Sequence, residues 1–195
     1  GQSDLIHRSS PVQIGTLSWS QVSVATGSAY AIRNTGALFT WGANSDGQLG
    51  SNTVTHRSSP VQVGNSSWVA ISAAWDNTQG AGSGFAAAIR SGGSLFTWGN
   101  NSSGQLGSNT IASRSSPVQV GGGTTWQEVA CGQQSTHVID GSGLVWGVGV
   151  NGDGQLGDGT LVSKSSLSLV TSVSPMRSLS ASAYNCAAIH ATTSK

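Results

Sequence analysis

Charged residues are scarce in this chain of 195 residues, making up 8% of it with a formal net charge of +1. That is about a third of the fraction usual in soluble domains. The sequence has no basic run or stripe, so we expect neither nucleic acid nor an anionic membrane surface as a partner. No apolar run approaches the length of a membrane-spanning helix, so we expect no membrane insertion.

Residues that favour helices are also few, because the chain has only one Glu and two Lys. Ser, Thr, Gly, Val and Asn are abundant instead, a mixture that suits short strands joined by tight turns. The sequence leaves open whether Cys131 and Cys186 are bridged or free, with buried free thiols favoured. The chain begins at Gly1 rather than Met, which suggests a processed product or a segment of a longer polypeptide.

An internal repeat of about 50 residues dominates the sequence. Residues 94–121 recur almost unchanged at 37–64 and in degraded form at 143–170, and the last part of the unit stands alone at 7–15. Such self-similarity means that one supersecondary unit is stacked several times. A period of about 40–50 residues with several short strands is typical of propeller blades.

Apolar alternation predicts four short strands in each unit: a VQVG strand, a Trp-led strand, an Ala-rich strand and an LFTWG strand. We therefore expect an all-β fold of propeller blades, each with four antiparallel strands, and about three and a half blades over residues 1–195. A further short strand is expected at 12–14, and two extra residues near Val148–Gly149 in the third unit. The units are predicted at approximately 1–15 (partial), 16–64, 65–121, 122–170 and 171–195 (partial).

Each whole unit carries a WG dipeptide followed by Asn-x-x-Gly-Gln-Leu-Gly, which lacks the Lys-Ser/Thr of a phosphate-binding loop. We expect the tryptophans to pack between blades and donate to backbone carbonyls, with ligand stacking as the alternative. The leucines would fill space between blades, and the glutamines would bond loop backbone. These structural residues are Trp41, Trp98, Trp146, Gln48, Gln105, Gln155, Leu49, Leu106 and Leu156.

Catalytic and metal-binding patterns find little support in the sequence. The histidines and the acidic residues are scattered, and residues 151–158 lack the spacing of a calcium loop. We therefore expect a protein that is not an enzyme and that uses no cofactor or metal. A repeated cation at Arg8, Arg57, Arg114 and Lys164 suits a structural contact, or alternatively a cationic ring on one rim.

The second unit alone carries a longer loop at 75–84, reading WDNTQGAGSG. Because loops that differ between repeats commonly carry recognition, we expect this loop to contact a partner. The candidate contact residues are Trp75, Asp76, Asn77 and Gln79.

Three WG and GQLG segments, together with VACGQQSTHVI at 129–139, resemble the regulator of chromosome condensation repeat. The resemblance covers essentially the whole chain and implies a β-propeller, commonly of seven four-stranded blades. It also implies protein binding through propeller-face loops, since members include a guanine-nucleotide exchange factor, ubiquitin-ligase modules and bacterial inhibitors. This chain would then be half of a seven-bladed ring or a segment of a larger one.

We expect a non-enzymatic interaction or structural module on a secreted or virion surface, such as a phage tail or capsid appendage. It would bind a protein or glycan through its rim loops, and would self-associate or join a larger assembly to cover its open blade faces. The alternative is a cytoplasmic regulator of the exchange-factor or inhibitor type. A third hypothesis, a lyase or hydrolase on a propeller scaffold, would need a metal or a carboxylate cluster on one rim.

Overall fold

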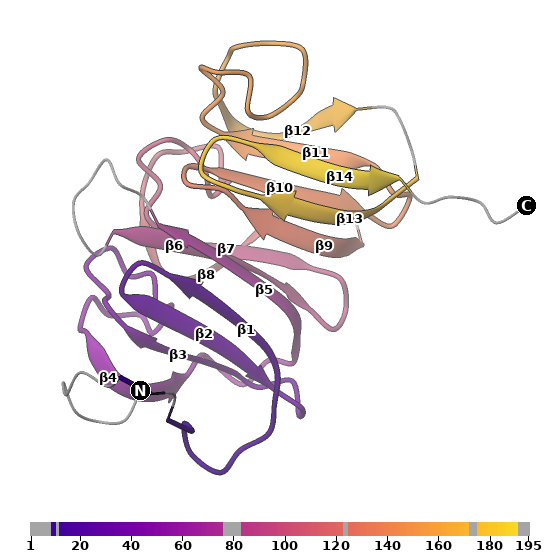
Figure 1. The fold of residues 1–195 in the computed structure, drawn as a ribbon. Helices are drawn as coiled ribbons and strands as arrows, with labels where there is room; N and C mark the ends of the chain where they lie inside the picture. Colours follow the sequence, from indigo (N-terminus) through magenta and orange to yellow (C-terminus); the bar gives the residue numbers. More distant parts are fainter. Residues whose placement is uncertain (1–8, 11, 76–82, 123–124, 172–174, 191–195) are drawn as a thin grey trace, which may run out of the picture.

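The computed structural model describes residues 9–10, 12–75, 83–122, 125–171 and 175–190, and all its regular elements there are β-strands (Figure 1). The strands are β1 (Trp19–Ala25), β2 (Ser28–Arg33), β3 (Leu38–Gly42), β4 (Arg57–Gln62), β5 (Trp68–Trp75), β6 (Gly84–Arg90), β7 (Leu95–Gly99), β8 (Arg114–Val120), β9 (Trp126–Cys131), β10 (Ser135–Asp140), β11 (Val145–Gly149), β12 (Lys164–Thr171), β13 (Met176–Ala181) and β14 (Cys186–His190).

These strands form three antiparallel sheets of four strands each, in the orders β1–β2–β3–β4, β5–β6–β7–β8 and β9–β10–β11–β12. β13 and β14 pair as a fourth sheet of two strands. The prediction of propeller blades with four antiparallel strands, about three and a half in number, is confirmed. We call the four sheets blades 1 to 4 in chain order.

Short polar turns join the second and third strands of each whole blade. In blade 1 the Arg33 N–H donates to the carbonyl of Ala37 at 2.9 Å, which closes the turn between β2 and β3. Gly36 has a φ of 85° in this turn, a backbone conformation that favours glycine. Local sequence therefore favours the turn of this hairpin.

The blades follow one another in chain order, and the first strands β1, β5, β9 and β13 lie next to each other (Figure 1). The core consists of apolar clusters between successive blades. The cluster between blades 1 and 2 is built around Trp68 and Trp98, and the cluster between blades 2 and 3 around Leu106 and Trp126. The small residues of β6, such as Ala87, are fully buried and let neighbouring sheets approach closely.

The third blade differs from the prediction in the register of its third strand. The pairing of β10 with β11 places Val148 at the position of Trp98, and Trp146 at the position of Phe96. Gly149, with a φ of 113°, corresponds to the glycine after Trp98, which has a φ of 100°. The expected two-residue insertion is therefore wrong, because the WG dipeptide of this blade lies two residues before the position it occupies in the others.

The fourth strand of each blade begins at the RSSP-like segment, earlier than predicted, so Pro60 and Pro117 lie inside β4 and β8. Both strands are at the edge of their sheets, where a residue without an N–H is tolerated. No strand forms at residues 12–14, where one was expected. In the described residues no blade precedes blade 1, so this segment has no neighbouring third strand on which to pair.

Candidate binding groove between the first two blades

A buried asparagine organises the loop that follows the third strand of each whole blade. In blade 1, Asn44 Oδ1 accepts the N–H of Leu49 at 2.8 Å, and its Nδ2 donates to the carbonyls of Thr53 and Thr55 at 2.8 and 3.1 Å. The same three contacts recur in the other two loops. The asparagines are Asn44, Asn101 and Asn151. Sequence reasoning assigned them no role, although their recurrence in the motif was the available signal.

The glutamine and leucine of the motif lie in the same loops. Gln48 Oε1 accepts the N–H of Asp46 at 3.0 Å, and Gln105 and Gln155 each accept the N–H two residues earlier at 2.9 Å. The leucines are buried, and their side chains are among the least exposed of the described residues. They are Leu49, Leu106 and Leu156.

The three predicted tryptophans occupy different environments. Trp98 is fully buried, and its indole N–H donates across the blade junction to the carbonyl of Gln48 at 2.8 Å. Trp146 donates instead to the carboxylate of Asp140 at 2.8 Å, so the expected backbone acceptor is wrong there. Trp41 is half-buried in blade 1. The WG dipeptide therefore does not predict one environment for its tryptophan.

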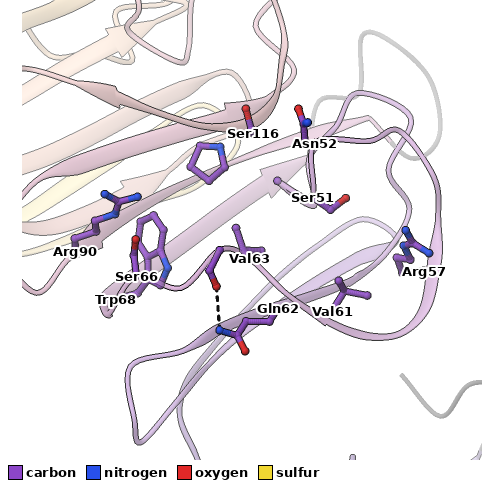
Figure 2. A pocket seen from close by; sticks show the side chains of 13 residues that line it. Ser51, Asn52, Arg57, Val61, Gln62, Val63, Ser66, Trp68, Arg90 and Ser116 are labelled. Atoms are coloured by element: carbon purple, nitrogen blue, oxygen red, sulfur yellow. Dashed lines mark hydrogen bonds between the residues drawn. The ribbon is translucent and has the colours of Figure 1, made fainter.

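A groove of about 350 Å³ opens between blades 1 and 2, and Figure 2 shows the side chains that line it. Val61 and Val63 of the first blade form one wall, and Pro117 of β8, in the second blade, also lines the groove. Arg90 lies at one end and Arg57 at the opposite end (Figure 2). The groove thus runs along the edge of β4 from one arginine to the other.

The two arginines give the groove a positive charge. The Arg90 guanidinium lies over the rings of Phe96 and Trp68, at 3.8 and 5.0 Å from their centroids, which are cation–π distances. The Nε–H groups of Arg57 and Arg90 are buried and have no hydrogen-bond partner among the described residues. None of the thirteen described residues that line the groove is an Asp or Glu.

The corresponding space between blades 2 and 3 is filled. There Leu167 occupies the position of Pro117 and packs against the core cluster of this junction. A Cβ atom added at Gly121 would lie 2.8 Å from Trp126 and 3.2 Å from Leu167. A Cβ atom added at the equivalent Gly64 would meet nothing within 4 Å. The open groove is therefore particular to the first of these two junctions.

Most of the predicted contact loop lies outside the described residues. Trp75 ends β5 and is 39% exposed. The other predicted contacts, Asp76, Asn77 and Gln79, lie outside the described residues.

The recurrent cations open the fourth strands, Arg57 in β4, Arg114 in β8 and Lys164 in β12, while Arg8 lies outside the described residues. Lys164 Nζ lies 3.9 Å from the carboxylate of Asp158. These side chains therefore follow the outer strands of the blades, and Arg57 alone of them lines the groove.

Titratable groups elsewhere in the described residues do not cluster. In this part of the chain, no three His, Cys, Asp or Glu side chains are placed to share a metal ion. Cys131 and Cys186 are both free, and burial raises the pKa of Cys131 to about 12. His137 is fully buried, and burial lowers its pKa to about 4, offset in part by the backbone of Gln155 and Leu156. Over the described ranges no helix is suited to span a membrane.

Two parts of the chain match a family model described as the Regulator of chromosome condensation (RCC1) repeat, at residues 35–78 and 92–139. A human protein named Probable E3 ubiquitin-protein ligase HERC3 is 33% identical over 125 residues, which are 63% of this chain and 12% of that protein. The expected resemblance to this repeat family is therefore confirmed.

Solved structures of yeast proteins share the fold. The structure of Prp20p from Saccharomyces cerevisiae, described with its binding properties to Gsp1p and histones, matches with a TM-score of 0.75 and 13% identity over 87% of this chain. Yeast RCC1 (Prp20) bound to Kap60 matches with a TM-score of 0.71 and 17% identity over 92% of this chain. In both cases the match spans 43% of the other chain, so this chain is less than half as long as those it resembles.

Proposed function

Because the chain is built from regulator of chromosome condensation repeats, we propose that it binds a partner protein as an intracellular regulator of the exchange-factor or inhibitor type. The relatives favour this alternative over a secreted or virion-surface role, since the yeast protein is described with Gsp1p and histones and the human one as a ubiquitin ligase. Fold alone does not give function, so the proposal depends on a surface of this chain.

The groove between blades 1 and 2 is the surface that carries the proposal. It combines an apolar wall, an edge strand and two arginines, a composition that suits protein recognition. The equivalent junction between blades 2 and 3 is closed by Leu167. Because the groove is open between blades 1 and 2 and filled between blades 2 and 3, the proposed recognition surface is confined to the first junction.

Binding to purified Gsp1p and to core histones, the partners named for the yeast relative, tests this function. We expect saturable binding of at least one of them in biolayer interferometry, reduced about tenfold or more by Pro117→Leu, which fills the groove. Leu161→Ser, an exposed position in another loop, is the matched control and should not change affinity. Absence of binding to both partners would remove the basis for this role.

The longer loop of the second unit is a second proposed contact surface, through Trp75, Asp76, Asn77 and Gln79. Its support is the partly exposed indole of Trp75, since exposed tryptophans are enriched at protein interfaces. Replacing residues 75–83 with the shorter connection of blade 1 should weaken partner binding while leaving thermal unfolding unchanged. Unchanged binding would assign recognition to the groove alone. A glycan as the bound partner remains a prediction without support from these residues.

Exposed apolar side chains at both ends of the blade stack support self-association or a larger assembly. Val22 of β1 is 65% exposed, whereas Ile71 at the same position of blade 2 is 3% exposed. At the other end, Ile189 of β14 is 54% exposed, whereas Ile139 at the same position of blade 3 is 1% exposed. We expect another blade, from a second copy or a longer polypeptide, to cover each face. Native mass measurement tests this, and a monomer with cooperative unfolding would contradict it.

A further inference from the structure

The backbone along one wall of the groove is suited to an extended peptide. β4 is the last strand of its sheet, so the backbone groups on its outer side have no strand partner in the described residues. Val61 to Gly64 line the groove along this edge. An edge strand beside an open groove can pair with an added strand, which gains affinity from main-chain hydrogen bonds.

The positive charge of the groove favours an added strand with acidic side chains. Figure 2 places Arg57 and Arg90 at opposite ends, and no lining residue is acidic. A guanidinium binds a carboxylate through two parallel N–H donors, which makes it specific for Asp, Glu or a similar anion. A segment with acidic side chains near both ends of its contact region would neutralise both arginines.

The groove has one apolar wall, while Ser51, Asn52, Gln62, Ser66 and Ser116 add polar side chains to its lining. The side chains of Val61, Val63 and Trp68 form this apolar wall, and Pro117 of β8 also lines the groove. Successive side chains of a strand point to opposite sides, so a bound strand would present one kind of side chain to this wall and another away from it. Alternating acidic and apolar residues fit this pattern.

The equivalent junction shows which features matter. Between blades 2 and 3, Leu167 fills the groove and Asp140 stands where blade 2 has Arg90. That junction lacks the space for an acidic strand, and the charge of Asp140 opposes that of Arg114, which occupies the position of Arg57. Two independent differences therefore favour the first junction, and both are differences in the residues that would contact the same ligand.

We propose that the groove between blades 1 and 2 binds an extended acidic segment of a partner protein by strand addition to β4, with carboxylates at Arg57 and Arg90. This inference rests on the proposed function and adds the chemistry of the partner and its mode of binding. It predicts a preference for acidic over basic peptides, and sensitivity to salt because the contacts are ionic.

Fluorescence anisotropy with a labelled nine-residue peptide of alternating Glu and Val tests the proposal, and the matching Lys–Val peptide is the charge control. We expect saturable binding of the acidic peptide only, weakened as salt rises. Pro117→Leu should reduce affinity about tenfold or more, and Arg57→Gln about fivefold to tenfold. Leu167→Pro, which opens the second junction beside Asp140, should add no acidic-peptide site. Thermal unfolding shows whether each variant remains folded.

Equal binding of the two peptides, no binding of either, or binding of the acidic peptide that Pro117→Leu leaves unchanged would overturn the inference. These results are separable from failure of the proposed function. If Gsp1p or histone binding depends on Pro117 while the acidic peptide does not bind, the groove is a protein-binding site and the acidic-strand mode is wrong. If the peptide binds and neither protein does, the groove chemistry stands and those partners are wrong.

Discussion

Blades 1 and 2 meet through the same repeat as blades 2 and 3, yet different residues fill the two junctions. At the first junction, a Cβ atom added at Gly50 would lie 2.8 Å from the indole nitrogen of Trp98. At the second, one added at Gly107 would meet Val148 at 3.4 Å and Leu167 at 3.7 Å. Two smaller side chains thus take the place of one indole.

At other positions of the two junctions, residues that contact each other also differ together between blades 2 and 3. Blade 2 has Arg90 over the ring of Phe96, whereas blade 3 has Asp140 bonded to the indole of Trp146. The register also pairs Ala87 with Thr97 in blade 2 and His137 with Gly147 in blade 3. Packed interiors tolerate substitutions that conserve volume and polar partners better than single changes. The repeat therefore fixes the space at each position, and several sets of side chains can fill it.

Trp98→Val should have the largest effect among changes that move one junction toward the other. It removes a fully buried indole and one of the two donors to the Gln48 carbonyl, which keeps the Tyr30 hydroxyl at 2.9 Å, so we expect the free energy of unfolding to fall by about 3–5 kcal/mol. Urea unfolding measures the loss.

The double variant Trp98→Val with Pro117→Leu sharpens this test, because it copies the pairing of Val148 with Leu167. We expect the added leucine to recover about 1–2 kcal/mol of the loss. If the double variant is no more stable than Trp98→Val alone, the two positions do not compensate one another.

His137 should make the stability of the chain depend on pH. Burial lowers its pKa from 6.5 to about 4, so the unfolded chain takes up a proton between these values before the folded chain does. The free energy of unfolding therefore decreases as pH falls from 6.5 to 4, by about 3 kcal/mol from this group. Urea unfolding at a series of pH values measures the slope.

The matched control is His137→Ala with Gly147→Thr, which recreates the Ala87 and Thr97 pair of blade 2. The added threonine hydroxyl should bond the Leu156 carbonyl as Thr97 bonds that of Leu106 at 2.8 Å. We expect this variant to lose the part of the pH slope between 6.5 and 4 that His137 causes. An unchanged slope would assign the pH dependence to carboxylates elsewhere.

Trp146→Phe should have a smaller effect. It gives blade 3 the aromatic residue of blade 2 but removes the indole donor to Asp140, which still accepts the N–H groups of Ser142 and Leu144 at 2.8 and 3.1 Å. We expect a loss of about 1–2 kcal/mol in the free energy of unfolding. Trp146→Phe with Asp140→Arg, the blade 2 pair, should be more stable than Trp146→Phe alone. A double variant that is less stable would mean that the surroundings of the two positions are not interchangeable.

The repeat made the blades predictable from sequence, because the strands alternate and the turns carry Gly and Asn. The WG dipeptide did not predict the register of the third blade. Trp146 belongs to this dipeptide, but the strand pairing places it at the position of Phe96. The GQLG loop was the better marker, because its buried asparagine makes the same backbone contacts in all three blades.

The groove could not be predicted from sequence either. The first two repeats are nearly identical around their RSSPVQVG segments, and the groove arises from what lies opposite in the next blade. Pro117 and Leu167 differ visibly in the alignment of the repeats, but only the packing of one blade on another shows that the leucine fills a space and the proline leaves it open. The groove therefore depends on which side chains of two neighbouring repeats face each other.

Asp158→Ser should have the smallest effect, because a serine can also hydrogen-bond the threonine of this loop. Asp158 accepts from the hydroxyl of Thr160 at 2.7 Å and from Asn151 at 2.9 Å, and these bonds together with Lys164 lower its pKa. The equivalent Ser108 contacts its own threonine hydroxyl at 3.1 Å, so serine suits this loop. We expect a loss below about 0.5 kcal/mol at neutral pH that shrinks in about 1 M salt, as for exposed ion pairs. Since the carboxylate acts only when ionised, the difference should also vanish as pH falls below its lowered pKa. A loss comparable to that of Trp146→Phe would mean that this loop depends on its charge rather than on the asparagine shared by all three blades.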